Sequence, residues 1–258
     1  NIDFDTFKYF EMSDLYKDKN SFYYHSDNDL KKIKSDIDVK SAEKVLKLND
    51  FIKDKNNLYY QEVKIDKIDN KNLKILYFDG IDVLKNGNKI FAEGKKLNIK
   101  SPETFEIILS KYYNFPNLIY GKDDKNVYAI SKFDKTYSSK VIKNADVNSF
   151  EVMENSMYTK DKNNIYFVSK SLYDEYDTYF EQDGIIKMKV ADKNSFVIEK
   201  NDFSYDKNSV YFMGKKINGI NSAGFKIISN LNSDFSFFLT DNKNLYKFIT
   251  IFSEDTDE

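Results

Sequence analysis

Few side chains in this sequence could do chemistry, and cysteine and histidine supply almost none of them. The chain of 258 residues contains no cysteine and one histidine, His25. Thiol catalysis, disulfides and cysteine-bound zinc are therefore excluded. A single histidine provides neither a metal cluster nor a catalytic triad, so we expect His25 to be a surface or structural residue.

Carboxylates are the remaining candidates, and the chain has 42 Asp and Glu residues. A pair of carboxylates can hydrolyse a glycosidic bond, but with so many acidic residues pairs arise by chance and none stands out. The run Asp27-Asn28-Asp29 resembles the start of a calcium loop, yet a full loop needs about five spaced ligands and a glycine. We predict no catalytic residue, no metal site and no cofactor.

The basic residues restrict the kinds of partner. All 40 of them are lysine, and the formal net charge is −2. Arginine is the usual bidentate reader of guanine and phosphate, so a near-neutral chain without it should bind nucleic acid poorly. No stretch approaches the roughly 18 apolar residues of a membrane helix. We therefore expect neither nucleic-acid binding nor a membrane span.

One short motif, called the head here, recurs along the chain. It reads Asp-Lys-Asn, one further polar residue, and an apolar-aromatic-aromatic triplet such as Phe22-Tyr23-Tyr24. Clear copies begin at Asp18, Asp54, Asp161 and Asp206, and weaker copies begin at Asn86, Asp123 and Asp241. Seven heads spaced roughly 32 to 45 residues apart indicate a repeat architecture.

Each part of the head favours a local structure. Asp caps the amides that follow it and Asn tolerates positive φ, so Asp-Lys-Asn predicts a turn. The predicted structural turn residues are Asp18, Asn20, Asp54, Asn56, Asp161, Asn163, Asp206 and Asn208. The triplet predicts a short strand that is apolar on both faces. Glu93-Gly94 or Gly214-Lys215 would then close a tight hairpin.

A second motif, called the tail here, follows each head. It reads Asp-x-x-Ser/Thr-Phe and runs into an apolar strand, as after Asp146 and Asp192. The Asp-x-x-Ser/Thr step predicts one capped helical turn. With one strand in the head, one closing its hairpin, one after the tail and one leading to the next head, we predict an all-β array. It would contain about seven short repeats of three to four strands, each stacked on its neighbours.

These motifs make the chain similar to the DKNYY family, a bacterial repeat family named for the head motif. The resemblance covers nearly the whole chain, although the heads at Asn86, Asp123 and Asp241 depart from the pattern. It implies a repeat protein and no defined activity. An association with immunity-type proteins, which neutralise a toxin, comes from the family and not from these residues.

The ends of the chain suggest how the array closes. Residues 3–7 match a tail, and the last head, at Asp241, has no tail after it. If the first tail completes the last head, the repeats close like a β-propeller, which removes exposed sheet edges. An open β-hairpin solenoid is the alternative. Residues 1–252 are expected to form a single repeat domain, and residues 253–258 an acidic disordered tail.

Two repeats carry extra residues, between residues 130 and 143 and between residues 170 and 187. Insertions in repeat folds lie in loops on one face, which is often the binding face. The second insertion therefore supplies the predicted binding residues Tyr173, Tyr176, Tyr179, Phe180, Asp174 and Glu175.

These observations favour a non-enzymatic scaffold that binds another protein, and an immunity-type toxin neutraliser is one version of it. The alternative is a secreted or surface-anchored module that binds a glycan. A hydrolase with carboxylates in the central channel of a ring is a third class. The compartment stays unknown, with the cell envelope or a secreted form favoured over the cytoplasm because the chain starts at Asn1.

Overall fold

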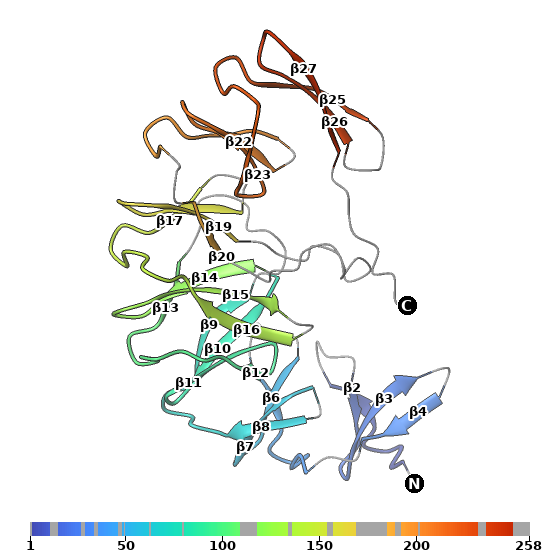
Figure 1. The fold of residues 1–258 in the computed structure, drawn as a ribbon. Helices are drawn as coiled ribbons and strands as arrows, with labels where there is room; N and C mark the ends of the chain where they lie inside the picture. Colours follow the sequence, from blue (N-terminus) through green and yellow to red (C-terminus); the bar gives the residue numbers. More distant parts are fainter. Residues whose placement is uncertain are drawn as a thin grey trace, which may run out of the picture. The chain divides into compact units, whose positions relative to one another are not determined.

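The computed structural model consists of short β-strands and turns (Figure 1). It describes residues 2–10, 15–26, 29–33, 36–45, 48, 50–61, 63–78, 80–108, 118–133, 136–153, 157–168, 185–188, 192–200, 202–231 and 236–249. These residues contain no helix, which confirms the predicted all-β fold. Among these residues there is also no helix that is long and apolar enough to span a membrane.

The strands form seven antiparallel sheets, numbered here in chain order. Six sheets have four strands and the seventh has three, as the repeat predicted. The first four are sheet 1, β1 (Lys8–Tyr9), β2 (Leu15–Lys17), β3 (Phe22–Ser26) and β4 (Asp29–Lys32); sheet 2, β5 (Glu43–Lys44), β6 (Phe51–Lys53), β7 (Asn57–Tyr60) and β8 (Val63–Lys67); sheet 3, β9 (Lys74–Phe78), β10 (Asp82–Asn86), β11 (Lys89–Ala92) and β12 (Lys95–Lys96); and sheet 4, β13 (Glu106–Ile108), β14 (Leu118–Lys122), β15 (Val127–Phe133) and β16 (Thr136–Val141). The others are sheet 5, β17 (Glu151–Val152), β18 (Tyr158–Lys160), β19 (Ile165–Val168) and β20 (Ile185–Lys187); sheet 6, β21 (Val197–Ile198), β22 (Phe203–Tyr205), β23 (Val210–Phe212) and β24 (Lys215–Ile217); and sheet 7, β25 (Lys226–Leu231), β26 (Ser236–Thr240) and β27 (Leu245–Ile249).

Each sheet begins with a tail and continues with the head that follows it. In sheet 1, the tail of residues 3–7 leads into β1, β2 leads to the head at Asp18, and the triplet of that head forms β3. The expectation that a head shares its unit with the tail after it is therefore wrong. The strands after a tail pair with the next head, because they reach it through a short antiparallel connection.

This pairing removes the argument for ring closure. The first tail hydrogen-bonds to the first head, since the Asp3 N–H donates to Asp18 Oδ2 at 2.8 Å. It is not left over to complete the last head at Asp241, whose own tail strand is β25. Seven tails and seven heads pair in order along the chain, which favours the open array over the β-propeller.

The hydrophobic cores lie between consecutive sheets, so the sheets bury their apolar side chains by packing against their neighbours. The chain divides into two compact units, residues 1–107 with 136–139 and residues 108–135 with 140–258. In the first unit, Phe22 of sheet 1 shares a core with Tyr59 of sheet 2. In the second, Phe203 of sheet 6 shares a core with Phe237 of sheet 7. The predicted stacking of repeats is thus present within each unit.

The hairpin after the head has a two-residue turn with positive φ at both residues. The turns are Glu93-Gly94 (φ 46° and 71°) and Met213-Gly214 (φ 48° and 73°), a combination that suits the twist of a hairpin. Sheet 6 therefore turns one residue earlier than the predicted Gly214-Lys215, because Phe212 pairs with Lys215.

Candidate binding site

The tail and the head of a sheet meet at a joint, and the first residue of the head, an Asp except for Asn86 in sheet 3, lies at its centre. In sheet 5, Asp161 Oδ1 accepts hydrogen bonds from the N–H groups of Asn163 and Asn164, both at 2.6 Å. Its Oδ2 accepts from the Tyr166 hydroxyl at 2.8 Å and from the tail N–H of Asp146 at 2.9 Å. Asp161 is 3% exposed, so these donors satisfy a carboxylate that water barely reaches.

The same centre recurs along the chain. The bonds from the amides two and three residues on, and from a Tyr hydroxyl five residues on, are accepted by Asp18, Asp54, Asp123, Asp161, Asp206 and Asp241. The residues Asn20, Asn56, Asn163 and Asn208 each donate their N–H to the head Asp. None of these four has positive φ, although Asn tolerates that conformation.

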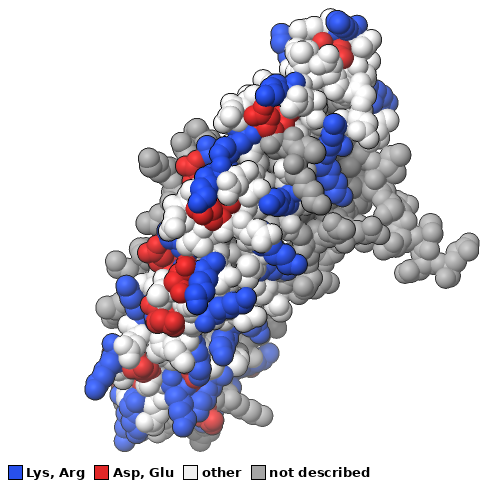
Figure 2. Space-filling view, turned by 60° about the vertical axis from the view of Figure 1, so that its left-hand side comes forward, with Lys and Arg blue, Asp and Glu red and all other residues white. Residues whose placement is uncertain are grey.

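The tail adds two further contacts to the joint. In sheet 5, the Lys162 N–H donates to Ser149 Oγ at 2.9 Å, and Lys162 Nζ pairs with Asp146 Oδ2 at 2.8 Å. The same two contacts occur at Lys19, Lys55 and Lys207 with the tails before them. Figure 2 shows basic and acidic side chains interspersed over the visible face.

The third head changes two positions together. Asn86 replaces the head Asp, and Phe91 replaces the Tyr five residues on. Asn86 Oδ1 accepts from the tail N–H of Asp69 at 2.8 Å, while its Nδ2 donates to Asp66 Oδ2 at 2.9 Å and to the Lys67 carbonyl at 2.8 Å. Asn86 therefore keeps the bond to the tail amide, while its Nδ2 turns to acceptors on β8 and Phe91 brings no hydroxyl to this joint.

Hydrogen bonds at the joint also affect the ionisation of head carboxyls. Burial works to raise the pKa of Asp161, but the donors from Asp146, Asn163, Tyr166 and Asn164 outweigh it and hold the pKa below its usual value. The pKa of Asp54 is lowered by the same balance. A carboxyl whose folded pKa is depressed stabilises the fold above its unfolded pKa of about 3.9, and that stability is lost as the pH falls further.

We therefore expect a constant melting temperature from neutral pH down to about pH 5, and a steep fall below about pH 4. Thermal melts followed by circular dichroism across this range would check it. A melting temperature that stayed unchanged down to about pH 2.5 would contradict the assigned role of the head carboxylates.

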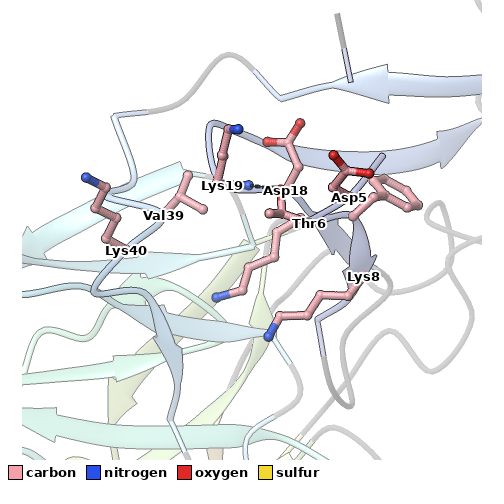
Figure 3. Close-up of a pocket in the computed structure, with 9 residues that line it drawn as sticks. Asp5, Thr6, Lys8, Asp18, Lys19, Val39 and Lys40 are labelled. Carbon is pink, nitrogen blue, oxygen red and sulfur yellow. Dashed lines mark hydrogen bonds between the residues drawn. The ribbon is translucent and has the colours of Figure 1, made fainter. Parts of the chain in front are cut away.

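Each joint is given the number of its sheet. Joints 1 and 5 have depressions on their surface, at equivalent positions of the repeat. The depression at joint 1 has a volume of about 550 Å³ and lies in the first unit (Figure 3). The depression at joint 5 has a volume of about 330 Å³ and lies in the second unit. Each is lined by the head Asp, the Lys after it, the tail Ser or Thr, and two residues of the next tail.

We call the recurring hydrogen bonds of the joint its frame. The linings of the two depressions differ at residues that take no part in this frame. Joint 1 has Lys8 on β1 opposite Lys17 on β2, whereas joint 5 has Glu151 on β17 opposite Lys160 on β18. The next tail contributes Val39 and Lys40 at joint 1 and Lys193 and Asn194 at joint 5. Sequence reasoning missed this site, although the exchange of Glu for Lys at one offset after the tail is visible in the letters.

The binding residues predicted from the sequence lie elsewhere. Tyr173, Tyr176, Tyr179, Phe180, Asp174 and Glu175 fall outside the described residues. The extra residues between 130 and 143 extend the hairpin of β15 and β16. His25 lies on β3, and its side chain is outside the description. Among the described residues, no group of three or more His, Asp or Glu side chains is placed to hold a metal ion.

The stacked sheets and their recurring joints define an all-β tandem-repeat protein. The chain matches the model of the DKNYY family over residues 29–170 and 169–250. It therefore belongs to the DKNYY family, as the head motif indicated. No curated protein and no solved structure shows a significant match to the chain.

Proposed function

We propose that this protein is a non-enzymatic repeat scaffold that binds another protein through its tail–head joints. The observation that carries the proposal is the combination of a constant frame with a variable lining. The hydrogen bonds of the joint recur from sheet to sheet, while the charges around the depressions change. Repeat proteins commonly bind in this way, because stacked units fix the positions at which variable side chains meet the ligand.

A protein partner suits these depressions better than a small molecule. Sites for small molecules are mostly lined by apolar and aromatic side chains. The depression at joint 1 is instead lined by four Lys and two Asp residues among its nine. Such a polar surface suits the wet, polar part of a protein interface. An immunity-type role, in which the partner is a toxin, is one form of this proposal.

Site-specific photo-cross-linking in the source cells tests the proposal. A benzophenone amino acid would replace Val39 at joint 1 or Asn194 at joint 5, and Lys64 on β8 in a matched control. We expect a discrete adduct with one protein from a joint position and none from the control. Identical adducts from all three positions, or no adduct from either joint, would overturn the proposal.

A further inference from the structure

The first joint contains a pair of like charges at a position where other sheets have an ion pair. Lys8 on β1 lies directly opposite Lys17 on β2. At the same offset, Glu43 pairs with Lys53 at 2.9 Å in sheet 2, and Glu151 pairs with Lys160 at 2.8 Å in sheet 5. Like charges directly opposite each other destabilise a sheet. Sheet 1 thus lacks the carboxylate that sheets 2 and 5 place beside this lysine.

Nothing else in the described residues supplies that carboxylate. The Lys17 ammonium lies 4.8 Å from the ring centroid of Phe10 and 5.8 Å from that of Phe22. Such contacts position a cation without neutralising it. Burial, and then the charge of Lys8, lower the pKa of Lys17. An arriving anion would remove this repulsion.

Sheet 3 shows how another lysine pair is relieved. Lys74 lies opposite Lys85 there. Lys85 Nζ donates to the carbonyls of Pro102 at 2.7 Å and Glu103 at 3.4 Å, so the next tail satisfies it. In sheet 1, no hydrogen bond joins Lys17 to the equivalent carbonyls of the next tail within the described residues, and that tail adds the charge of Lys40 to the lining. The lysine pair of sheet 1 therefore lacks the hydrogen bonds that stabilise Lys85 in sheet 3.

The carboxylate at the centre of the first joint cannot take this role. Asp18 Oδ1 accepts from the N–H groups of Asn20 and Ser21, both at 2.7 Å. Its Oδ2 accepts from the Asp3 N–H and the Tyr23 hydroxyl, both at 2.8 Å. Each carboxylate oxygen of Asp18 thus already accepts two hydrogen bonds within the joint. Asp5 is exposed at the rim.

The lysines at the first joint differ in how free they are. Lys19 pairs with Asp3 at 2.5 Å, whereas Lys8, Lys17 and Lys40 pair with no carboxylate in the described part of the chain. Figure 3 shows Lys8, Lys19 and Lys40 on three different segments around the depression, with their side chains pointing in different directions. Lys8 and Lys17, which lie opposite each other, thus stand without a carboxylate among the described residues, and Lys40 adds positive charge to the same lining.

We propose that the depression at joint 1 binds carboxylates of an acidic segment in the partner protein, an inference that rests on the proposed function. In sheets 2 and 5 the lysine equivalent to Lys17 pairs with a carboxylate, Glu43 or Glu151, at the position that Lys8 holds in sheet 1. Lysine presents compact point charges, whereas bidentate recognition of phosphate favours arginine. A run of Asp or Glu in the partner would supply the counter-charge that sheet 1 lacks.

The test uses the full chain and a fluorescein-labelled hexaglutamate peptide, followed by fluorescence anisotropy. Lys8→Glu rebuilds the ion pair of the sibling sheets, so it should fold with an equal or higher melting temperature. It should weaken peptide binding by about tenfold or more. Lys64→Glu on β8 makes the same change in charge away from the joint, and its affinity should stay within about threefold of wild type.

Each other outcome overturns the inference. Equal losses from Lys8→Glu and Lys64→Glu would mean that only net charge matters. Equal binding of a hexaglutamine peptide would contradict the assignment of a carboxylate ligand. So would displacement of the labelled peptide by inorganic phosphate at the concentration at which unlabelled hexaglutamate displaces it. Unchanged binding by Lys8→Glu would remove the site. The proposed function is judged separately by the adduct from Asn194, because Lys8→Glu leaves joint 5 intact.

Discussion

Replacing Asp161 with alanine should destabilise the second unit by about 3–5 kcal/mol. The substitution removes an acceptor that serves three N–H groups and the Tyr166 hydroxyl. Hydrogen bonds to a charged group contribute about 1.5–3 kcal/mol each, and buried donors left without a partner add a penalty, although the terms are not additive. Urea-induced unfolding followed by tyrosine fluorescence would measure the loss.

Two further variants separate the joint from a general loss of charge. Glu151→Ala removes an exposed carboxylate of the same sheet and should cost no more than about 1 kcal/mol. Asp161→Asn should be better tolerated together with Tyr166→Phe than alone, because the third head carries Asn86 with Phe91. Additive effects of these two substitutions would contradict the coupling inferred between the Asp and the Tyr.

Replacing Gly214 with alanine should destabilise the second unit by about 2–5 kcal/mol. Gly214 has φ of 73°, and a Cβ there would lie 2.6 Å from Cβ of Phe167 in the sheet before it. The new methyl group would meet both an unfavourable backbone conformation and a packed aromatic side chain. Gly94 has the same φ class and lies against Tyr60 of sheet 2, so close packing of a hairpin on the preceding sheet occurs in both units.

Gly219 offers the matched control within the same unit. Its φ is 85°, but no atom lies within 4 Å of the position that a Cβ would take. Gly219→Ala should therefore cost only the conformational part, about 1–2 kcal/mol. Equal losses at Gly214 and Gly219, compared by urea unfolding, would show that contact with Phe167 contributes nothing.

The sequence predicted the kinds of element well because the repeat states them many times. Apolar-aromatic-aromatic triplets form strands such as Ile165–Val168, and the Asp-x-x-Ser/Thr step forms a turn in which the Ser149 N–H bonds to the Asp146 carbonyl at 3.3 Å. Local propensity determines such pieces. It does not determine which strands share a sheet, because a tail lies between two heads and either could be its partner.

A signal for the correct pairing is nevertheless present within the chain. Four of the five tails that begin with Asp precede heads with Lys at the second position and pair with that Lys, as Asp146 does with Lys162; the exception is Asp69, before Gly87. The tails that begin with Ser101 and Asn221 precede heads with Asp124 and Asn242 at that position. Charge matching between a tail and the next head therefore predicts the sheets better than the order of motifs does.

The candidate site was harder to predict because it depends on an absence of charge matching. Lys8 is unremarkable in a chain with 40 lysines. It becomes informative only when the register places it opposite Lys17 and places Glu151 opposite Lys160. Register follows from the pairing of tail with head, which the motif order alone did not give.

Transplanting the lining of joint 1 to joint 5 tests most directly whether a constant frame with variable side chains selects the ligand. Glu151→Lys would place a lysine opposite Lys160, beside Lys162 and Lys193. Made in the Lys8→Glu chain, it should restore most of the lost affinity for hexaglutamate, whereas Glu103→Lys, an equal change in charge on an exposed tail residue, should not. Binding restored by Glu151→Lys but not by Glu103→Lys, each made in the Lys8→Glu chain, would support the account. No restoration, or the same restoration from Glu103→Lys, would contradict it.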